Sequence, residues 1–387
     1  MDEHQQDYMA RALALARRAL GRVSPNPAVG AVVVRDGRVV GQGFTQPPGG
    51  PHAEIVALRE AGQAARGAVL YCTLEPCCHT GRTGPCTEAI IRAGVAEVRY
   101  AVDDPDPRVA GGGRAALEAA GVRVVAGEGR EEAERLYEAY AKHRRTGLPF
   151  VIAKFAASLD GKIAAAGGGS RWITGPESRA WAHRQRAAVD AILAGVETVL
   201  KDDPELTARP DGRPAERQPL RVVADSRGRT PPSARLLSAP GPVLVATTAA
   251  SPAAWRAGLA ARGAEVLVLP DRDGRVDLRS LLAVLGERGV LSLLAEGGGV
   301  LLGGLFDARL VDKVWAFVAP VVIGAAEAPS PVAGRGARTM AEAVRLERTE
   351  VARLGPDLLV TGYPVYPEGA DITERKEDAE GDVHRHH

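Results

Sequence analysis

The chain lacks several features that would assign it to particular classes of protein. No run of about 18 apolar residues occurs, which excludes a transmembrane helix of ordinary length. The first residues are polar and acidic and no apolar segment follows them, so we expect a cytoplasmic protein without a secretory signal. Aromatic residues make up 4% of the chain and the formal net charge is +1. Neither value is typical of a protein that coats nucleic acid.

Lysine is also scarce, and charge is distributed unevenly. Only six of the 49 basic residues are lysines, which we attribute to codon bias rather than to a phosphate-binding surface built from arginine. The last 20 residues carry a net charge of −4 and almost nothing apolar, so we expect them to be disordered. The three histidines among the last four residues are predicted to be solvated rather than to bind a metal.

Cysteine is absent from the chain except for one short segment. All four cysteines, Cys72, Cys77, Cys78 and Cys86, lie within 15 residues. A disulfide-stabilised fold would distribute its cysteines more widely. In a cytosolic protein such a cluster indicates a metal site or a reactive thiol.

The first part of the chain alternates between predicted helices and strands. Apolar residues at Met9, Leu13, Ala16 and Leu20 give a helix with one apolar face. Asp36 and Gly37 separate two β-branched runs and predict a hairpin. The alternation favours an α/β unit with a mostly parallel sheet. The predicted helices are residues 7–21, 53–65, 87–93, 114–120 and 130–143, and the strands are 28–34, 38–43, 68–73, 97–102 and 122–125.

A second α/β unit begins near residue 147, where a turn-rich segment precedes a new buried strand. We therefore predict a first domain over residues 1–146, a second over 147–366, and a charged tail over 367–387. The second domain has predicted strands at 150–155, 189–194, 220–224, 243–247, 265–269 and 291–295, and helices at 176–186, 252–261, 278–285 and 300–306.

Two segments of the first domain together have the composition of a catalytic zinc site. His52 precedes Glu54 at a predicted helix start, and the pairs Pro76-Cys77 and Pro85-Cys86 follow. One imidazole and two thiolates leave the fourth position of zinc open for water, whose pKa the metal lowers to about 7. An H-x-E motif followed by Pro-Cys is a signature of zinc deaminases, in which the glutamate moves protons. Here eight residues separate Cys77 from Cys86, where the usual spacing is two.

Other assignments of these residues remain open. His52 could be an ordinary histidine at a helix start, and Cys72 or Cys78 could supply the second thiolate, although we expect both to be packing residues. His79 either contacts substrate or orients its loop.

In the second domain, Glu296 and three glycines separate a predicted strand from a helix. Glycines in such a turn let backbone N–H groups approach a phosphate at the helix N-terminus. A tight structural turn would explain the same residues, and the G-x-G-x-x-G pattern of dinucleotide-binding folds is absent.

The cysteine segment resembles the deaminase part of the bifunctional deaminase and reductase family of riboflavin biosynthesis. The segments Ser24 to Gly30 and Asp103 to Pro107 are similar to further motifs of that family. Residues 154–163, 170–174, 190–209 and 296–299 resemble its reductase part, so the resemblance covers residues 5–366. One departure is Thr45, at a place where the family usually has a histidine.

The resemblance implies a cytidine-deaminase-like three-layer α/β/α domain followed by a dihydrofolate-reductase-like α/β domain. It also implies Zn²⁺ and NADPH as cofactors, a phosphorylated pyrimidine as substrate, and a homo-oligomer. The expected reactions are deamination of 2,5-diamino-6-ribosylamino-4(3H)-pyrimidinone 5′-phosphate, then reduction to 5-amino-6-ribitylaminouracil 5′-phosphate.

Site residues follow from the same resemblance and from the motifs above. The zinc ligands are His52, Cys77 and Cys86, and the catalytic residue is Glu54. NADPH contacts are expected at Ala156, Trp172, Thr198, Asp202, Gly298, Gly299, Val300, Leu301, Leu302, Gly303 and Gly304. Substrate contacts are expected at Asn26, His79, Ser170, Arg186, Leu206, Arg209 and Glu296.

Arg186 and Arg209 could bind a ribose phosphate, because a guanidinium group can donate two hydrogen bonds to a phosphate. Surface ion pairs would also explain the presence of these two arginines. Trp172 could equally be a core residue, but its glycine-rich surroundings favour an exposed ring.

Two other functions remain possible at this point. A nucleic-acid or nucleoside deaminase with an accessory nucleotide-binding domain would share the zinc chemistry, but a nucleic-acid deaminase would need a basic channel and aromatic side chains on which bases stack. A zinc-stabilised binding protein would not need Glu54 beside an open coordination position.

Overall fold

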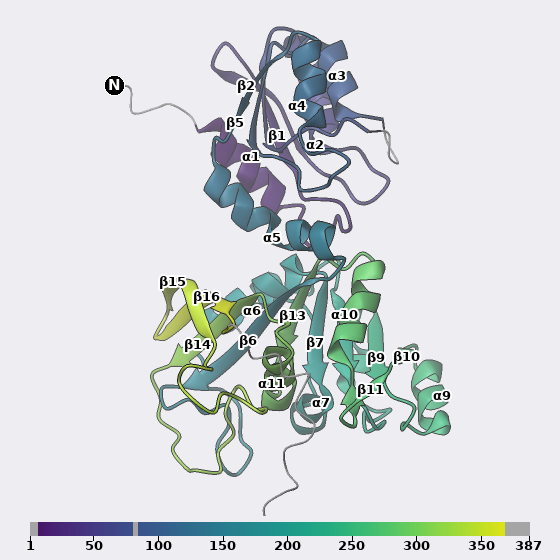
Figure 1. Ribbon diagram of the computed structural model, residues 1–387, viewed down its shortest axis with the longest axis vertical. Helices are drawn as coiled ribbons and strands as arrows, with labels where there is room; N and C mark the ends of the chain where they lie inside the picture. Colours follow the sequence, from purple (N-terminus) through teal and green to yellow (C-terminus); the bar gives the residue numbers. More distant parts are fainter. Residues whose placement is uncertain (1–6, 80–83, 368–387) are drawn as a thin grey trace, which may run out of the picture.

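The computed structural model describes residues 7–79 and 84–367 and contains two α/β units stacked along the long axis of the molecule (Figure 1). The expectation of disorder in the charged tail concerns residues outside this described part. The helices among the described residues are all too short or too polar to cross a bilayer.

The first unit is a five-stranded sheet between two layers of helices. Its strand order is β2-β1-β3-β4-β5. Helices α1 and α5 contact one face, whereas α2 packs on β1 and β2 of the other face and adjoins α3. The strands are β1 (Gly30–Arg35), β2 (Arg38–Phe44), β3 (Val69–Leu74), β4 (Glu97–Val102) and β5 (Arg123–Ala126), and the helices are α1 (Tyr8–Arg17), α2 (Ala53–Ala61), α3 (Cys86–Ala93), α4 (Gly112–Ala119) and α5 (Arg130–Thr146).

The predicted hairpin of this unit is confirmed, but the prediction of a mostly parallel sheet is wrong here. Strand β1 runs antiparallel to both β2 and β3, and only the β3-β4 and β4-β5 pairs are parallel. The Asp36-Gly37 turn makes β2 antiparallel to β1. The second antiparallel pair was not foreseeable, because it depends on how α2 crosses the sheet.

The second unit is a nine-stranded sheet of order β10-β9-β8-β7-β13-β6-β14-β16-β15. Its first seven strands in this order are parallel, and β16 and β15 complete it as an antiparallel edge. The strands are β6 (Phe150–Ser158), β7 (Ala191–Gly195), β8 (Leu220–Ala224), β9 (Val243–Thr247), β10 (Glu265–Val268), β13 (Ser292–Glu296), β14 (Lys313–Ala319), β15 (Arg345–Leu354) and β16 (Asp357–Val365); β11 (Asp271–Arg272) and β12 (Arg275–Val276) form a separate small ribbon.

The helices of this unit connect successive parallel strands. Those expected from the sequence are present with ends shifted by a few residues, whereas α7 and the short α8 were not predicted. The α-helices are α6 (Pro176–Ala188), α7 (Val196–Asp202), α8 (Arg235–Ser238), α9 (Ala253–Ala261), α10 (Leu278–Glu287) and α11 (Gly299–Asp307).

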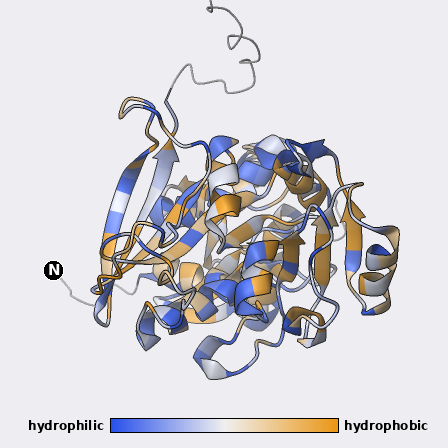
Figure 2. Cartoon of the chain, turned by 90° about the horizontal axis from the view of Figure 1, so that it is seen from below, coloured by the Kyte–Doolittle hydropathy of each residue, from blue (hydrophilic) through white to orange (hydrophobic). Residues whose placement is uncertain are grey.

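Three strands of the nine-stranded sheet, β14, β15 and β16, were not predicted from the sequence, nor was the small β11-β12 ribbon. Strand β15 has the sequence RLERTEVARL and is largely exposed, so it has no alternating apolar face that periodicity could detect. Figure 2 shows the contrast: apolar residues concentrate on the central strands, and hydrophilic residues dominate the outer edge where β15 lies. The central strands β6, β7 and β13 are buried along most of their length.

Helix α5 lies at the junction of the two units and contacts both (Figure 1). Tyr137 and Tyr140 point into the first unit and are buried. Glu138 faces the second unit, where it binds Lys313 Nζ at 2.8 Å and accepts a hydrogen bond from Tyr363 at 2.6 Å. Lys142 forms an ion pair with Asp312 of the second unit. One face of α5 therefore packs in the first unit, and the other face binds the second unit.

Close backbone packing fixes helix α11 beneath the loop that follows β14. A Cβ atom added at Gly303 would lie 0.9 Å from the carbonyl oxygen of Ala333, so only glycine fits there. Asp307 accepts a hydrogen bond from the backbone of Arg335 at 2.9 Å, which holds the same loop.

We predict that Gly303→Ala destabilises the protein by about 1–3 kcal/mol or more, because the loop must move to admit the methyl group. The matched control is Gly258→Ala, at a helical position where nothing lies within 4 Å of the added Cβ. That change should raise stability by roughly 0.5–1 kcal/mol, since alanine favours helix over glycine. Thermal unfolding of both variants tests the prediction, and equal shifts would contradict it.

Candidate functional site

Three elements of the first unit bring the predicted zinc ligands together. His52 immediately precedes α2, Cys77 lies in the loop after β3, and Cys86 is the first residue of α3. Their donor atoms all lie within 4.8 Å of one another. His52 Nδ1 is 3.6 Å from the sulfur of Cys77 and 3.3 Å from that of Cys86.

These separations fit a tetrahedral zinc ion. Zn–S bonds of about 2.3 Å and Zn–N bonds of about 2.0–2.1 Å place nitrogen and sulfur ligands about 3.5 Å apart. The hydrogen bond between Cys77 and Cys86 lowers the pKa of Cys77 well below its usual value, and His52 adds to this effect. A thiolate, the form that binds zinc, is therefore favoured at this position.

The other two cysteines lie apart from this cluster. Cys72 is fully buried on β3, and burial raises the pKa of its thiol. Cys78 is half-buried, and its sulfur contacts the carbonyl oxygen of Arg108 at 3.9 Å. Neither belongs to the group of donor atoms that could hold an ion among the described residues, as the sequence led us to expect.

Glu54 lies in the first turn of α2 beside the three donor atoms. Its side chain is almost fully buried, and its Oε2 atom has no hydrogen-bond partner among the described residues. Burial, and then the charge of Cys77, raises its pKa to about 7. A carboxyl group of this pKa can both accept and return a proton near neutral pH.

A cavity of about 330 Å³ opens beside these residues, a volume suited to a small molecule. We call it the first-unit pocket. Of the predicted substrate contacts, Asn26 and His79 line it, and the Nδ1 atom of His79 has no hydrogen-bond partner among the described residues. Its lining residues are Pro25, Asn26, Pro27, Val29, Thr45, Gly49, Gly50, His52, Glu54, Leu74, Glu75, Cys77, His79, Asp104, Asp106, Arg108, Tyr140 and Arg144.

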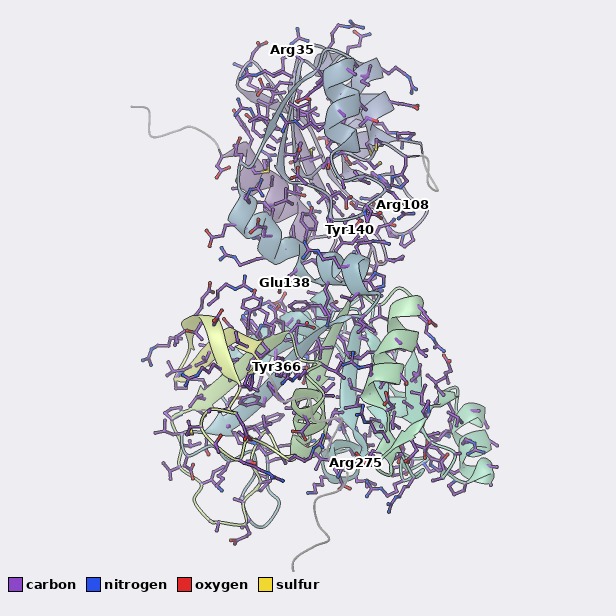
Figure 3. All side chains as sticks on the ribbon, viewed as in Figure 1. Arg35, Arg108, Glu138, Tyr140, Arg275 and Tyr366 are labelled. Atoms are coloured by element: carbon purple, nitrogen blue, oxygen red, sulfur yellow. The ribbon has the colours of Figure 1, made fainter. Side chains whose placement is uncertain are left out.

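Several lining residues were missed as site residues. Asp104, Asp106 and Arg108 follow β4, within or next to the Asp-Asp-Pro-Asp-Pro motif, which was the available signal. Tyr140 and Arg144 come from α5, and Figure 3 shows Tyr140 and Arg108 at the lower end of the first unit. No sequence pattern marked these two helix residues, because the face of α5 that meets the pocket is set by packing.

Thr45 also lines the pocket, but its hydroxyl group is engaged within the protein. It accepts a hydrogen bond from the backbone of Val29 at 3.0 Å, and the Thr45 backbone donates to Val29 in return at 2.9 Å. Thr45 thus holds the segment that carries Asn26 against β2.

In the second unit, a buried ion cluster lies where the end of β13 pairs with the middle of β6. Arg186 of α6 forms a bidentate pair with Glu296, at 2.7 and 2.6 Å, and Lys154 Nζ lies 3.9 Å from the same carboxylate. Although burial opposes it, the charges of Arg186 and Lys154 lower the pKa of Glu296 to about 2. Burial lowers the pKa of Lys154. Sequence reasoning missed Lys154 as a site residue, although it stands in the motif that opens this domain.

The other predicted arginine, Arg209, follows a loop with unusual backbone geometry. Leu206 has φ 53°, in the left-handed region that a bulky residue rarely adopts and that often marks functional sites. Arg209 binds Glu205 at 2.5 Å and Thr207 at 2.6 Å, whereas Arg186 donates to the Thr207 carbonyl at 3.1 Å. The surface ion pair that was the alternative for both arginines does not apply to Arg186, since the Arg186–Glu296 pair is buried. It does describe Arg209, whose pair with Glu205 leaves both side chains about one-third exposed.

Most of the predicted cofactor contacts lie on two helices, α7 and α11. Asp202 accepts a hydrogen bond from Ser170, a predicted substrate contact, at 2.8 Å, and Thr198 lies beside Gly297 and Gly298. Trp172 is 70% exposed, so it is not a core residue. Gly298 and Gly299 lie at the N-terminus of α11, whereas Leu301, Leu302 and Gly303 are buried. Ala156 and Gly304 are half-buried, and Val300 is exposed.

Comparison with known proteins assigns both units. The model of the RibD C-terminal domain matches residues 149–360, and the model of the cytidine and deoxycytidylate deaminase zinc-binding region matches residues 2–102. The riboflavin biosynthesis protein RibD of Escherichia coli is 41% identical over 361 residues, which cover 91% of this chain and 97% of that protein. The protein of that name from Bacillus amyloliquefaciens is 41% identical over 359 residues, or 92% of this chain and 95% of the relative.

Solved structures agree over both units. Acinetobacter baumannii RibD has a TM-score of 0.82 at 36% identity and covers 92% of this chain and 98% of its own. A Thermotoga maritima protein described as a diaminohydroxyphosphoribosylaminopyrimidine deaminase/5-amino-6-(5-phosphoribosylamino)uracil reductase has a TM-score of 0.79 at 34% identity, with the same coverage. The expected order, a deaminase fold followed by a reductase fold, is confirmed. The chain belongs to the RibD family of bifunctional deaminases and reductases of riboflavin biosynthesis.

Proposed function

We propose that the first-unit pocket deaminates 2,5-diamino-6-ribosylamino-4(3H)-pyrimidinone 5′-phosphate and that the second unit reduces the product with NADPH. The observation that supports the first step is the buried carboxylate of Glu54 beside three zinc-type donor atoms, with one oxygen that has no partner in residues 7–79 and 84–367. His52, Cys77 and Cys86 would hold zinc, which when bound lowers the pKa of water at its open position.

Glu54 moves the protons of this step. Its carboxylate takes a proton from the attacking water as the new C–O bond forms on the amino-bearing carbon of the pyrimidine. It then gives that proton to the amino nitrogen, so that the C–N bond breaks and ammonia leaves. Water is consumed and ammonia is released, and nothing is oxidised or reduced. Asn26 and His79 line the pocket where they can orient the ring.

The second step opens the ribose ring and reduces C1′. NADPH supplies the hydride, and a proton must reach the ring oxygen, which becomes a hydroxyl group of the ribityl chain. We assign this proton to Lys154, whose ammonium group is buried beside Glu296 and Arg186. Arg186, Arg209, Ser170, Leu206 and Glu296 are the proposed substrate contacts. The proposed NADPH contacts are Trp172, Thr198, Asp202, Ala156 and the α11 segment from Gly298 to Gly304.

The proposal includes a free phosphorylated pyrimidine as substrate rather than nucleic acid. A homo-oligomer and a cytoplasmic location are part of the same proposal and rest on the family. The domain limits of 1–146 and 147–366 are proposed on the end of α5 at Gly147, which takes φ 73°.

The zinc assignment predicts which cysteines matter. Cys86→Ala should abolish bound zinc, because only two ligands would remain. Cys78→Ala, which removes a thiol outside the donor group, should keep about one zinc per chain. Atomic absorption on the purified proteins measures this, and zinc loss in both variants would contradict the assignment.

Glu54→Gln should retain zinc and lose deamination by about 10²–10⁴-fold, the usual contribution of a positioned general base. Reduction of the uracil intermediate should persist in this variant. Glu88→Gln, the same change at an exposed position of α3, serves as the control. Unchanged ammonia release by Glu54→Gln would refute the role of Glu54.

Lys154→Arg should keep the charge beside Glu296 and retain substrate affinity, but lose reduction, because a guanidinium does not release its proton. In the unmodified protein the reductase kcat should fall as pH rises through the pKa of Lys154, which burial places below the ordinary lysine value of 10.5. NADPH oxidation with the uracil intermediate measures both effects. A fully active arginine variant would show that Lys154 acts through its charge alone.

A further inference from the structure

Arg144 reaches the first-unit pocket from the last turn of α5, away from the candidate zinc ligands. Its Nη2 atom donates to the Pro25 carbonyl at 3.0 Å, and its guanidinium lies 5.0 Å from the ring centroid of Tyr140. Tyr140 is itself fixed, because its hydroxyl group donates to Asp104 at 3.2 Å. The guanidinium is therefore held in place on two sides before any ligand enters.

The charge of Arg144 is only partly matched by the protein. Asp106 is the nearest carboxylate, but its two oxygens accept hydrogen bonds from Arg108 at 3.0 and 2.5 Å, whereas Arg144 Nε lies 3.8 Å away. Two guanidinium groups thus share one carboxylate. Asp104 lines the same pocket, and one of its oxygens already accepts from Tyr140 and from the Asp106 backbone.

One donor of Arg144 is both buried and unsatisfied. Its Nε atom has almost no solvent contact and no hydrogen-bond partner among the described residues. A buried donor without an acceptor is unfavourable, so such groups usually mark a place where a ligand or water completes the site. A phosphate has the oxygen acceptors and the negative charge to do so.

We propose that Arg144 binds the 5′-phosphate of the pyrimidine substrate and makes the deaminase selective for the phosphorylated compound. This inference rests on the proposed deamination in the same pocket and adds the group that recognises the far end of the substrate. Arg108, bound to Asp106, keeps that carboxylate from neutralising Arg144. The sugar phosphate lies toward α5 when the ring lies beside Glu54.

The test uses the full-length, zinc-loaded protein and two compounds, the diaminopyrimidine ribosyl 5′-phosphate and the same compound without phosphate. Arg144→Met removes the charge and retains most of the side-chain length. Arg145→Met makes the same change one residue later, where the side chain is exposed. Ammonia release gives kcat and KM for each compound, and NADPH oxidation on the uracil intermediate shows whether the second unit remains intact.

Arg144→Met should raise KM for the phosphorylated compound about 10- to 100-fold with kcat nearly unchanged, the range expected for a lost charge-assisted hydrogen bond. It should leave kcat/KM for the dephosphorylated compound unchanged, and Arg144→Lys should restore part of the loss. Arg145→Met should match the unmodified protein.

Two results would overturn this inference. Equal losses on both compounds would show that Arg144 only supports the Pro25 segment, and no loss on either would show that phosphate lies elsewhere. Failure of the proposed function is a separate result: the unmodified protein would then release no ammonia from either compound.

Discussion

The placement of the two units relative to each other depends on the ion pairs and hydrogen bonds that α5 makes on its two faces. Tyr137 donates to the Ala28 carbonyl of the first unit, whereas Glu138, the next residue, binds Lys313 and Tyr363 of the second unit. Figure 3 places Glu138 between the units and Tyr140 beside the first. Because the helix is rigid, the position of the pocket wall is tied to the edge of the nine-stranded sheet.

Both proposed sites use buried charge, but in different ways. In the second unit, Glu296 is matched by Arg186 and Lys154, so a carboxylate is stable there despite its burial. In the first, Glu54 and Arg144 each keep a buried polar atom that has no partner within the part of the chain that the structure describes. A buried charge that is fully paired stabilises the local structure, whereas a buried polar atom without a partner can be satisfied by a bound ligand.

The parts of this architecture that could be predicted from the sequence are those whose pattern of residues lies within short segments. The hairpin at Asp36-Gly37, the buried strands and the His52, Glu54, Cys77 and Cys86 cluster all depend on local spacing, and the structure brings the cluster together. Strand β15 could not be predicted, because its polar residues gain stability from pairing with β16 rather than from an apolar face. Lys154, Tyr140 and Arg144 were missed for a related reason, since tertiary packing decides which helix or strand face meets a cavity.

The parallel direction of the central strands determines where the two proposed sites lie relative to each other. Asp190 and Ser292, at the starts of β7 and β13, line a small hollow together with Asn26 and Tyr140 of the first unit. Glu296 and the α11 turn follow the opposite ends of these strands. The first unit therefore adjoins the N-terminal ends of these strands, and the proposed reductase site lies at their C-terminal ends. Because both units belong to one chain, they are always made in equal numbers, and the length of the parallel strands separates the hollow beside the first unit from the Glu296 turn.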